Sequence, residues 1–240
     1  MKPSKIGVFD SGVGGLFVLK ELLKIHPNNE YYYYGDTLHM PYGNKDLKEL
    51  LKYSYQIIDY LQSQKVDLII CACGTLSSNI LKEMQEYSKV PLIGILNDTI
   101  NYLNNHEFNN ILVLSTVNTH KSGYFKQNIK KNVTSIGADN LAYLIENNLD
   151  YREYMDKLLS DYPKNYDAIV LGCTHYSAIK DYLKANYASK IIDMGSILAN
   201  NLDLANQERK LYFYFSQKDD QIKTKIQKIL EIPEEEICLN

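Results

Sequence analysis

The chain has 240 residues, of which 45% are hydrophobic and 23% charged, and its formal net charge is −3. This length allows one large or two small domains, and the composition is that of a folded protein rather than a disordered one. With 26 basic against 29 acidic side chains, the chain has no basic excess to neutralise phosphates. The composition therefore disfavours a nucleic-acid partner and favours small-molecule chemistry.

The apolar runs are short. Residues 68–74 and 90–96 are the longest, well below the roughly 20 residues of a membrane-spanning helix, so we expect no membrane partner. We expect no secretory signal at the N-terminus, because Asp10 breaks its short apolar stretch. The four cysteines are too few for a disulfide framework, which favours reduced thiols in the cytoplasm: Cys71, Cys73, Cys173 and Cys238.

Short apolar runs alternate with segments of helical period, which is typical of parallel α/β units. Strands are predicted over residues 6–9, 31–34, 68–72, 92–95, 111–114, 133–136, 168–171 and 191–193. The clearest helix is expected over residues 46–64, with Asn44 as its cap. Further helices are expected after Gly14, Ser77, Thr119, Leu149, His175 and Gly195. A last strand over 211–215 and an amphipathic helix around residues 222–230 are expected to pack on the first half.

The two halves of the chain repeat one another. Residues 67–73 match residues 167–173 at an offset of one hundred, and residues 6–11 match 111–116. The repeat predicts an α/β fold of two similar lobes, each an open, mostly parallel sheet flanked by helices, with the active site in the cleft between them. We assign residues 1–97 plus 208–240 to the first lobe and residues 98–207 to the second.

Cys73 and Cys173 occupy equivalent positions in this repeat. Each ends an apolar strand and precedes the expected start of a helix, where backbone N–H groups and the helix dipole lower a thiol pKa. A lone cysteine is usually a small buried hydrophobe, but two at matching positions point to a shared role. A carbon held between them could lose a proton to one thiol and gain one from the other, which is the geometry of a racemase.

Other interpretations of these residues remain open. Cys71 and Cys73 could form half of a metal site, although no second pair lies at ligand spacing, and Cys173 with His175 could form a protease-type nucleophile. Residues 9–16 form a glycine-rich turn that either binds an anion or is capped by Asp10. The hydroxyls of residues 115–119 could hold a carboxylate or cap the next helix.

Four segments together resemble the bacterial glutamate racemases of the aspartate/glutamate racemase family. They are residues 6–16, Gly35-Asp36-Thr37, Pro41-Tyr42-Gly43 and Leu171-Gly172-Cys173-Thr174-His175-Tyr176. The resemblance covers nearly the whole chain, and the related aspartate racemases typically carry a glutamate after Gly-Cys-Thr. It implies interconversion of L- and D-glutamate without a cofactor or metal, to supply peptidoglycan synthesis, by an enzyme that forms a homodimer.

The same resemblance implies roles for individual residues. Cys173 would remove the α-proton of L-glutamate while Cys73 protonates the opposite face, with Asp10 and His175 assisting the thiols and Glu146 supporting the second base. Substrate-binding positions would be Asp10, Ser11, Tyr42, Gly43, Gly74, Thr75, Thr116, Thr119, Thr174 and His175. A carboxylate beside Cys73 should raise the pKa of that thiol, so we expect Asp10 and Cys73 to share a proton.

The chain departs from the family pattern at Gly74, where the family carries an asparagine that contacts the substrate. Losing such a hydrogen bond typically costs about 1–3 kcal/mol when its partner stays buried and unpaired. Two milder departures are Ser177, where the family usually carries proline, and Ala138, which lies near a position that is often cysteine in the family. Two alternatives follow: a racemase for another small amino acid such as aspartate, or a catalytically degenerate paralogue that acts as a binding protein.

Overall fold

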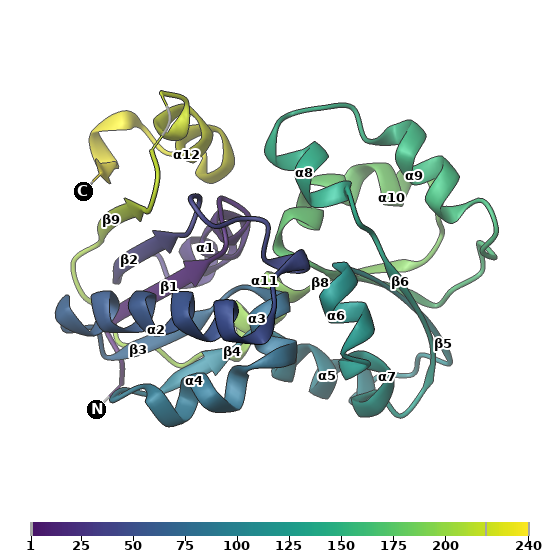
Figure 1. Cartoon of the computed structure of the whole chain (residues 1–240), viewed down its shortest axis with the longest axis horizontal. Helices are drawn as coiled ribbons and strands as arrows, with labels where there is room; N and C mark the ends of the chain where they lie inside the picture. Colours follow the sequence, from purple (N-terminus) through teal and green to yellow (C-terminus); the bar gives the residue numbers. More distant parts are fainter. Residues whose placement is uncertain (1, 219, 240) are drawn as a thin grey trace.

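Two parallel sheets form the centre of the molecule in the computed structural model, which describes residues 2–218 and 220–239 (Figure 1). Residues 1, 219 and 240, which we assign to the first lobe, lie outside the described residues. The first part of the chain contains β1 (Lys5–Asp10), α1 (Gly15–Ile25), β2 (Glu30–Gly35), the 3-10 helix η1 (Tyr42–Asn44), α2 (Leu47–Ser63), β3 (Leu68–Cys71), α3 (Gly74–Asn79), α4 (Leu81–Tyr87), β4 (Leu92–Gly94) and α5 (Leu96–Asn105).

The second part repeats the alternation. It contains β5 (Asn110–Ser115), α6 (Val117–Lys121), α7 (Tyr124–Asn128), β6 (Asn132–Gly137), α8 (Leu141–Glu146), α9 (Arg152–Leu159), β7 (Ala168–Gly172), η2 (Thr174–Ile179), α10 (Lys180–Asn186), β8 (Lys190–Asp193) and α11 (Met194–Asn201). The chain ends with β9 (Lys210–Phe215), α12 (Ile222–Leu230), η3 (Glu234–Glu236) and β10 (Cys238–Leu239).

The strand order confirms the predicted repeat. The first sheet runs β10-β9-β2-β1-β3-β4 and the second runs β6-β5-β7-β8, so the order β2-β1-β3-β4 recurs as β6-β5-β7-β8. β1 pairs in parallel with β3, Val8 beside Ile70, as β5 pairs with β7, Val113 beside Val170. β9 pairs with β2, so the last segment packs on the first lobe as expected. The predicted two-lobe α/β class is confirmed.

Helices α1, α5 and α11 join the two lobes through their apolar faces. α11 packs on both α1 and α5. Fully buried side chains of this layer, such as Leu19 and Leu198, belong to one apolar core that also contains Ile6 of the first sheet and Ile111 of the second. Because parallel strands need both faces covered, this shared layer holds the sheets together. Across the described residues, no helix has both the length and the apolarity needed to cross a bilayer.

The start of α2 differs from the prediction, because Asp46 and not Asn44 caps it. The Asp46 carboxylate accepts the backbone N–H of Glu49 at 2.9 Å, and the Glu49 side chain accepts the N–H of Asp46 in return. This capping box fixes the first turn of the helix. Asn44 lies instead in the short helix η1, within the loop that leads from β2 to α2.

Candidate active site

A cavity of about 70 Å³ lies between the carboxyl ends of the two sheets. Strand β3 leads into Cys73 and strand β7 leads into Cys173, so equivalent strands of the two lobes deliver the two thiols to the same cavity. Cys73 is 4% exposed and Cys173 is 7% exposed. Most of the other residues that the sequence indicates also line this cavity: Ser11, Tyr42, Gly43, Gly74, Thr75, Thr116, Thr174 and His175.

Asp10, Thr119 and Glu146 lie behind the cavity lining. Asp10 ends β1 and is completely buried, Thr119 donates its backbone N–H to the Thr116 hydroxyl at 3.3 Å, and Glu146 contacts His175. These three residues therefore support lining residues instead of facing the cavity directly.

Only one oxygen of the Asp10 carboxyl group accepts hydrogen bonds. Its Oδ2 accepts the backbone N–H of Gly15 at 2.7 Å and the hydroxyl of Thr174 at 3.2 Å, while its Oδ1 has no hydrogen-bond partner. Burial raises the pKa of Asp10 above 3.8, against the opposing effects of the His175 charge and the hydrogen bonds. A negative charge therefore costs more at Asp10 than at an exposed carboxyl group.

Burial and then the Asp10 charge raise the pKa of the Cys73 thiol well above 9.0. The expectation that a helix start lowers the pKa of this thiol is thus wrong, because the backbone hydrogen bond from Leu76 is outweighed. The expectation that the neighbouring Asp10 carboxylate raises the pKa of Cys73 is confirmed. The Sγ of Cys73 lies 4.0 Å from the Ser11 hydroxyl oxygen and keeps its proton, which suits a group that acts first as an acid.

Cys173 faces a buried imidazole–carboxylate pair. Its Sγ lies 3.8 Å from Nδ1 of His175, whose Nε2 lies 2.6 Å from Oε2 of Glu146, and the His175 and Glu146 side chains are each 6% exposed. Burial alone would lower the pKa of His175, but the contacts with Cys173 and Glu146 raise it well above 6.5. The protonated ring donates to the carboxylate on one side and toward the sulfur on the other. The two thiols thus have opposite surroundings.

Contacts between the lobes close the cavity. The Thr75 and Thr116 hydroxyl oxygens lie 3.0 Å apart, and the Asn118 side-chain amide donates to the backbone carbonyl of Lys45 at 3.0 Å. A Cβ added at Gly74 would lie 2.8 Å from the carbonyl oxygen of Gly172. The missing side chain at Gly74 therefore allows the start of α3 to approach the end of β7.

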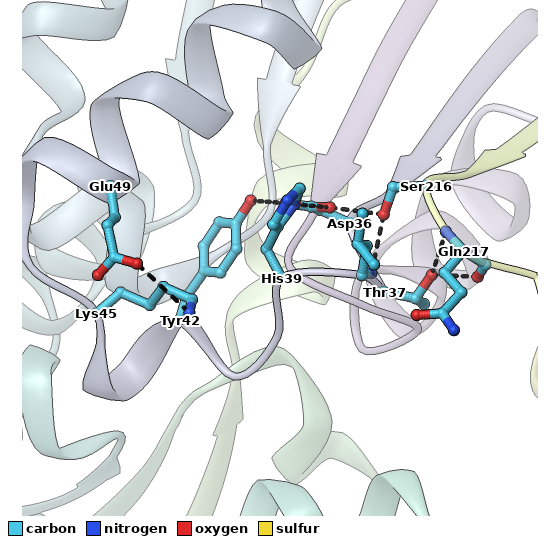
Figure 2. A network of polar contacts seen from close by, with 9 residues as sticks. Asp36, Thr37, His39, Tyr42, Lys45, Glu49, Ser216 and Gln217 are labelled. Atoms are coloured by element: carbon cyan, nitrogen blue, oxygen red, sulfur yellow. Dashed lines mark hydrogen bonds and ion pairs between the residues drawn. The ribbon is translucent and has the colours of Figure 1, made fainter.

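The loop between β2 and α2, which carries Tyr42 into the cavity wall, is tied to the end of β9 (Figure 2). The buried Asp36 carboxylate accepts three hydrogen bonds. They come from the Tyr42 hydroxyl, the Ser216 hydroxyl at 2.6 Å and Nδ1 of His39 at 2.8 Å. Thr37 and Gln217 are hydrogen-bonded beside it. Sequence reasoning missed this network: Asp36 stands in the motif Gly35-Asp36-Thr37, but Ser216, 180 residues later, gave no signal.

The thiol–imidazole contact expected for a Cys173–His175 nucleophile is present, whereas Cys71 and Cys238 lie apart from the paired thiols. Cys71 is fully buried, its thiol accepts from the Ser77 hydroxyl at 3.6 Å, and burial raises its pKa to about 12, as for a core residue. Within residues 2–218 and 220–239, no group of three or more potential His, Cys, Asp or Glu ligands is arranged to hold a metal ion. Cys238 is exposed in β10, outside the cavity lining.

Comparison with known proteins identifies relatives along the whole chain. Residues 20–202 match the family model described as Asp/Glu/Hydantoin racemase. The glutamate racemase of Fusobacterium nucleatum is 38% identical over 203 residues, 80% of this chain and 77% of that protein. The glutamate racemase of Campylobacter jejuni is 31% identical over 91% of this chain and 95% of its own. The crystal structure of Francisella tularensis glutamate racemase in complex with D-glutamate superposes with a TM-score of 0.85 at 28% identity, covering 99% of this chain and 96% of that one.

Proposed function

The chain belongs to the Asp/Glu/hydantoin racemase family, and on this basis we propose that it interconverts L- and D-glutamate without a cofactor. One observation carries the proposal: Cys73 and Cys173, delivered by equivalent strands of the two lobes, line a single cavity. The resemblance of the motifs and the named relatives support glutamate as the substrate.

In the proposed reaction, the Cys173 sulfur takes the α-proton of L-glutamate as the Cα–H bond breaks. The electron pair stays on the substrate as a carbanion delocalised into the α-carboxylate. The Cys73 thiol then gives its proton to the opposite face, so a new Cα–H bond forms and D-glutamate results. The roles reverse for D-glutamate, and the number of protons on the enzyme is unchanged over one turnover.

The surroundings of each thiol suit its proposed role. The protonated His175, held by Glu146, places a positive charge beside Cys173 and stabilises negative charge on that sulfur. Asp10 and burial favour the protonated thiol at Cys73. Two groups whose environments differ in this way form an acid and base pair. A substrate that fills the cavity displaces water from it, which strengthens the interactions that stabilise the carbanion.

We assign substrate binding to hydroxyls and backbone amides at the ends of the strands. Ser11, Thr75 and Thr116, which carry hydroxyls, line the cavity, and the first turn of α3 follows Cys73 directly. Such groups bind carboxylates through several N–H and O–H donors. Tyr42 and Gly43 form the wall that the Asp36 network supports.

The proposed product, D-glutamate, would supply peptidoglycan synthesis in the cytoplasm, and the resemblance adds that the enzyme acts as a homodimer. Size-exclusion chromatography with light scattering tests the dimer.

The activity is tested by following the circular dichroism of L-glutamate with the purified, reduced protein. The signal should decay to zero and the signal of D-glutamate should decay at a related rate, while L-aspartate offered as a control should keep its signal. A stable L-glutamate signal would overturn the proposal, and decay of the aspartate signal alone would assign the other amino acid.

A further inference from the structure

A buried tyrosine beneath the cavity holds the turn between β1 and α1. The Tyr33 hydroxyl on β2 donates to the backbone carbonyl of Gly12 at 2.6 Å. The Tyr33 side chain is 1% exposed and Gly12 is buried, so this carbonyl has no access to solvent as an alternative partner. A buried hydrogen bond of this kind fixes the position of both groups, because either one left alone is costly.

The turn leaves little room for adjustment. A Cβ added at Gly15 would lie 2.6 Å from the Asp10 Cβ and 2.9 Å from the Tyr33 hydroxyl oxygen. A Cβ added at Gly35 would lie 2.6 Å from two ring carbons of Phe215 and 2.8 Å from the Gly12 carbonyl oxygen. Gly15 and Gly35 thus leave the space in which Tyr33, the turn and Asp10 pack against one another.

The same turn carries the groups around Cys73. Gly15 donates its N–H to the Asp10 carboxylate at 2.7 Å, and the Ser11 hydroxyl oxygen lies 4.0 Å from the Cys73 Sγ. A shift of the Gly12 peptide therefore moves the neighbours of Cys73 directly. Burial, followed by the charges of Asp10, Glu146 and Cys73, raises the pKa of Tyr33 well above 10.0, so its hydroxyl remains a donor throughout the working pH range.

We propose that Tyr33 is a positioning residue for the Cys73 half of the proton transfer, and that it acts through its hydrogen bond to the Gly12 carbonyl. This role rests on the proposed racemisation. The placement of Asp10 and Ser11 by Tyr33 can be tested without that reaction. Tyr33 does not line the cavity and takes no proton itself.

The chain offers a matched control on the same strand. Tyr31, two residues earlier on β2, is also fully buried and donates its hydroxyl to the His26 carbonyl at 2.8 Å, away from the cavity. Tyr33→Phe and Tyr31→Phe each remove one oxygen atom and one hydrogen bond to a backbone carbonyl, buried for Tyr33 and partly buried for Tyr31. Tyr33→Phe is expected to lower kcat about 10- to 100-fold with KM close to that of the parent, because small misplacements of reacting groups have effects of this size. Tyr31→Phe is expected to keep the parent kcat.

A second readout needs no substrate. Iodoacetamide alkylates each thiol at a rate that depends on its surroundings, and mass spectrometry separates the Cys73 and Cys173 peptides. Tyr33→Phe should change the Cys73 rate severalfold and leave the Cys173 rate unchanged. A Gly35→Ala variant, whose Cβ would meet both the Phe215 ring and the Gly12 carbonyl oxygen, should also change the Cys73 rate and leave the Cys173 rate unchanged, so the test does not depend on one variant folding.

The outcomes separate the two proposals. If the parent protein fails to racemise glutamate, the proposed function falls, and the alkylation rates still decide the role of Tyr33. If Tyr33→Phe behaves like Tyr31→Phe in both kcat and Cys73 alkylation, the positioning role is overturned. Equal changes at Cys73 and Cys173 would also overturn it, because they would show a general loosening of the fold.

Discussion

Gly74 and Gly172 bring the two lobes into backbone contact beside the thiols, since a Cβ at Gly74 would stand 2.8 Å from the Gly172 carbonyl oxygen. Gly74 directly follows Cys73 and Gly172 directly precedes Cys173, so this contact lies next to both proposed bases. The glycine in place of the family's asparagine therefore does more than remove a hydrogen-bonding side chain. It allows an approach between the lobes that any larger residue would prevent.

Gly74→Asn should lower both stability and activity, although it restores the residue of the family pattern. The new side chain meets a backbone carbonyl that cannot rotate away, and overpacking of this kind typically costs about 1–3 kcal/mol. Urea unfolding and the racemisation rate measure the two effects. Higher activity at unchanged stability would show that the asparagine fits and that the contact has no role.

Cys73→Ser and Cys173→Ser should each lower the racemisation rate by about 100-fold or more, because a serine hydroxyl is a poor acid or base at neutral pH. Cys73→Ser should still exchange the α-proton of L-glutamate with solvent, and Cys173→Ser that of D-glutamate. Proton NMR in D2O with each enantiomer measures this exchange. Cys71→Ser, at the neighbouring core position, is the control that retains both thiols of the cavity. Unchanged racemisation in either of the first two variants would contradict the two-base account.

Asp10→Asn should stabilise the fold as pH rises while it slows racemisation. The pKa of Asp10 is raised in the folded state, so ionisation costs stability progressively from about pH 3.8 upward, until the folded-state pKa is passed. Asparagine does not ionise and keeps an oxygen acceptor for Gly15 and Thr174. Thermal unfolding from pH 4 to 8 should show a parent–variant difference that grows with pH. A constant difference would show that the pKa of Asp10 is the same in the folded and unfolded states, contrary to the raised value that burial gives it.

Glu146→Gln should lower the pKa of His175, because it removes one of the two groups that raise it. A histidine with a raised folded-state pKa stabilises the fold fully below about pH 6.5, and this stabilisation is lost as pH rises through the folded-state pKa. The variant should therefore be less stable than the parent mainly near pH 6, and the difference should shrink at higher pH. Its racemisation rate should also fall at a lower pH than that of the parent. Identical pH profiles would remove Glu146 from the proposed support of Cys173.

The repeated architecture was predictable because its signals are local. The apolar runs that end at Cys73 and Cys173 are continuous, and their offset of one hundred residues is visible in the sequence. The Asp36–Ser216 contact was not predictable, since it joins residues 180 positions apart through the pairing of β2 with β9. The raised pKa of Cys73 depends on burial, which a strand-to-helix pattern does not reveal. The contact between the lobes at Gly74 was not predictable either, because a glycine in the sequence does not indicate which atoms lie beside it in the fold.

The most direct test of the two-thiol account is racemisation of L-glutamate in D2O, stopped at early conversion and analysed by chiral separation and mass spectrometry. Two separate bases predict that the D-glutamate formed carries deuterium at Cα, while the remaining L-glutamate keeps its original hydrogen. D-glutamate that retains the hydrogen of its precursor would mean that one group removes and returns the proton, and it would contradict the account.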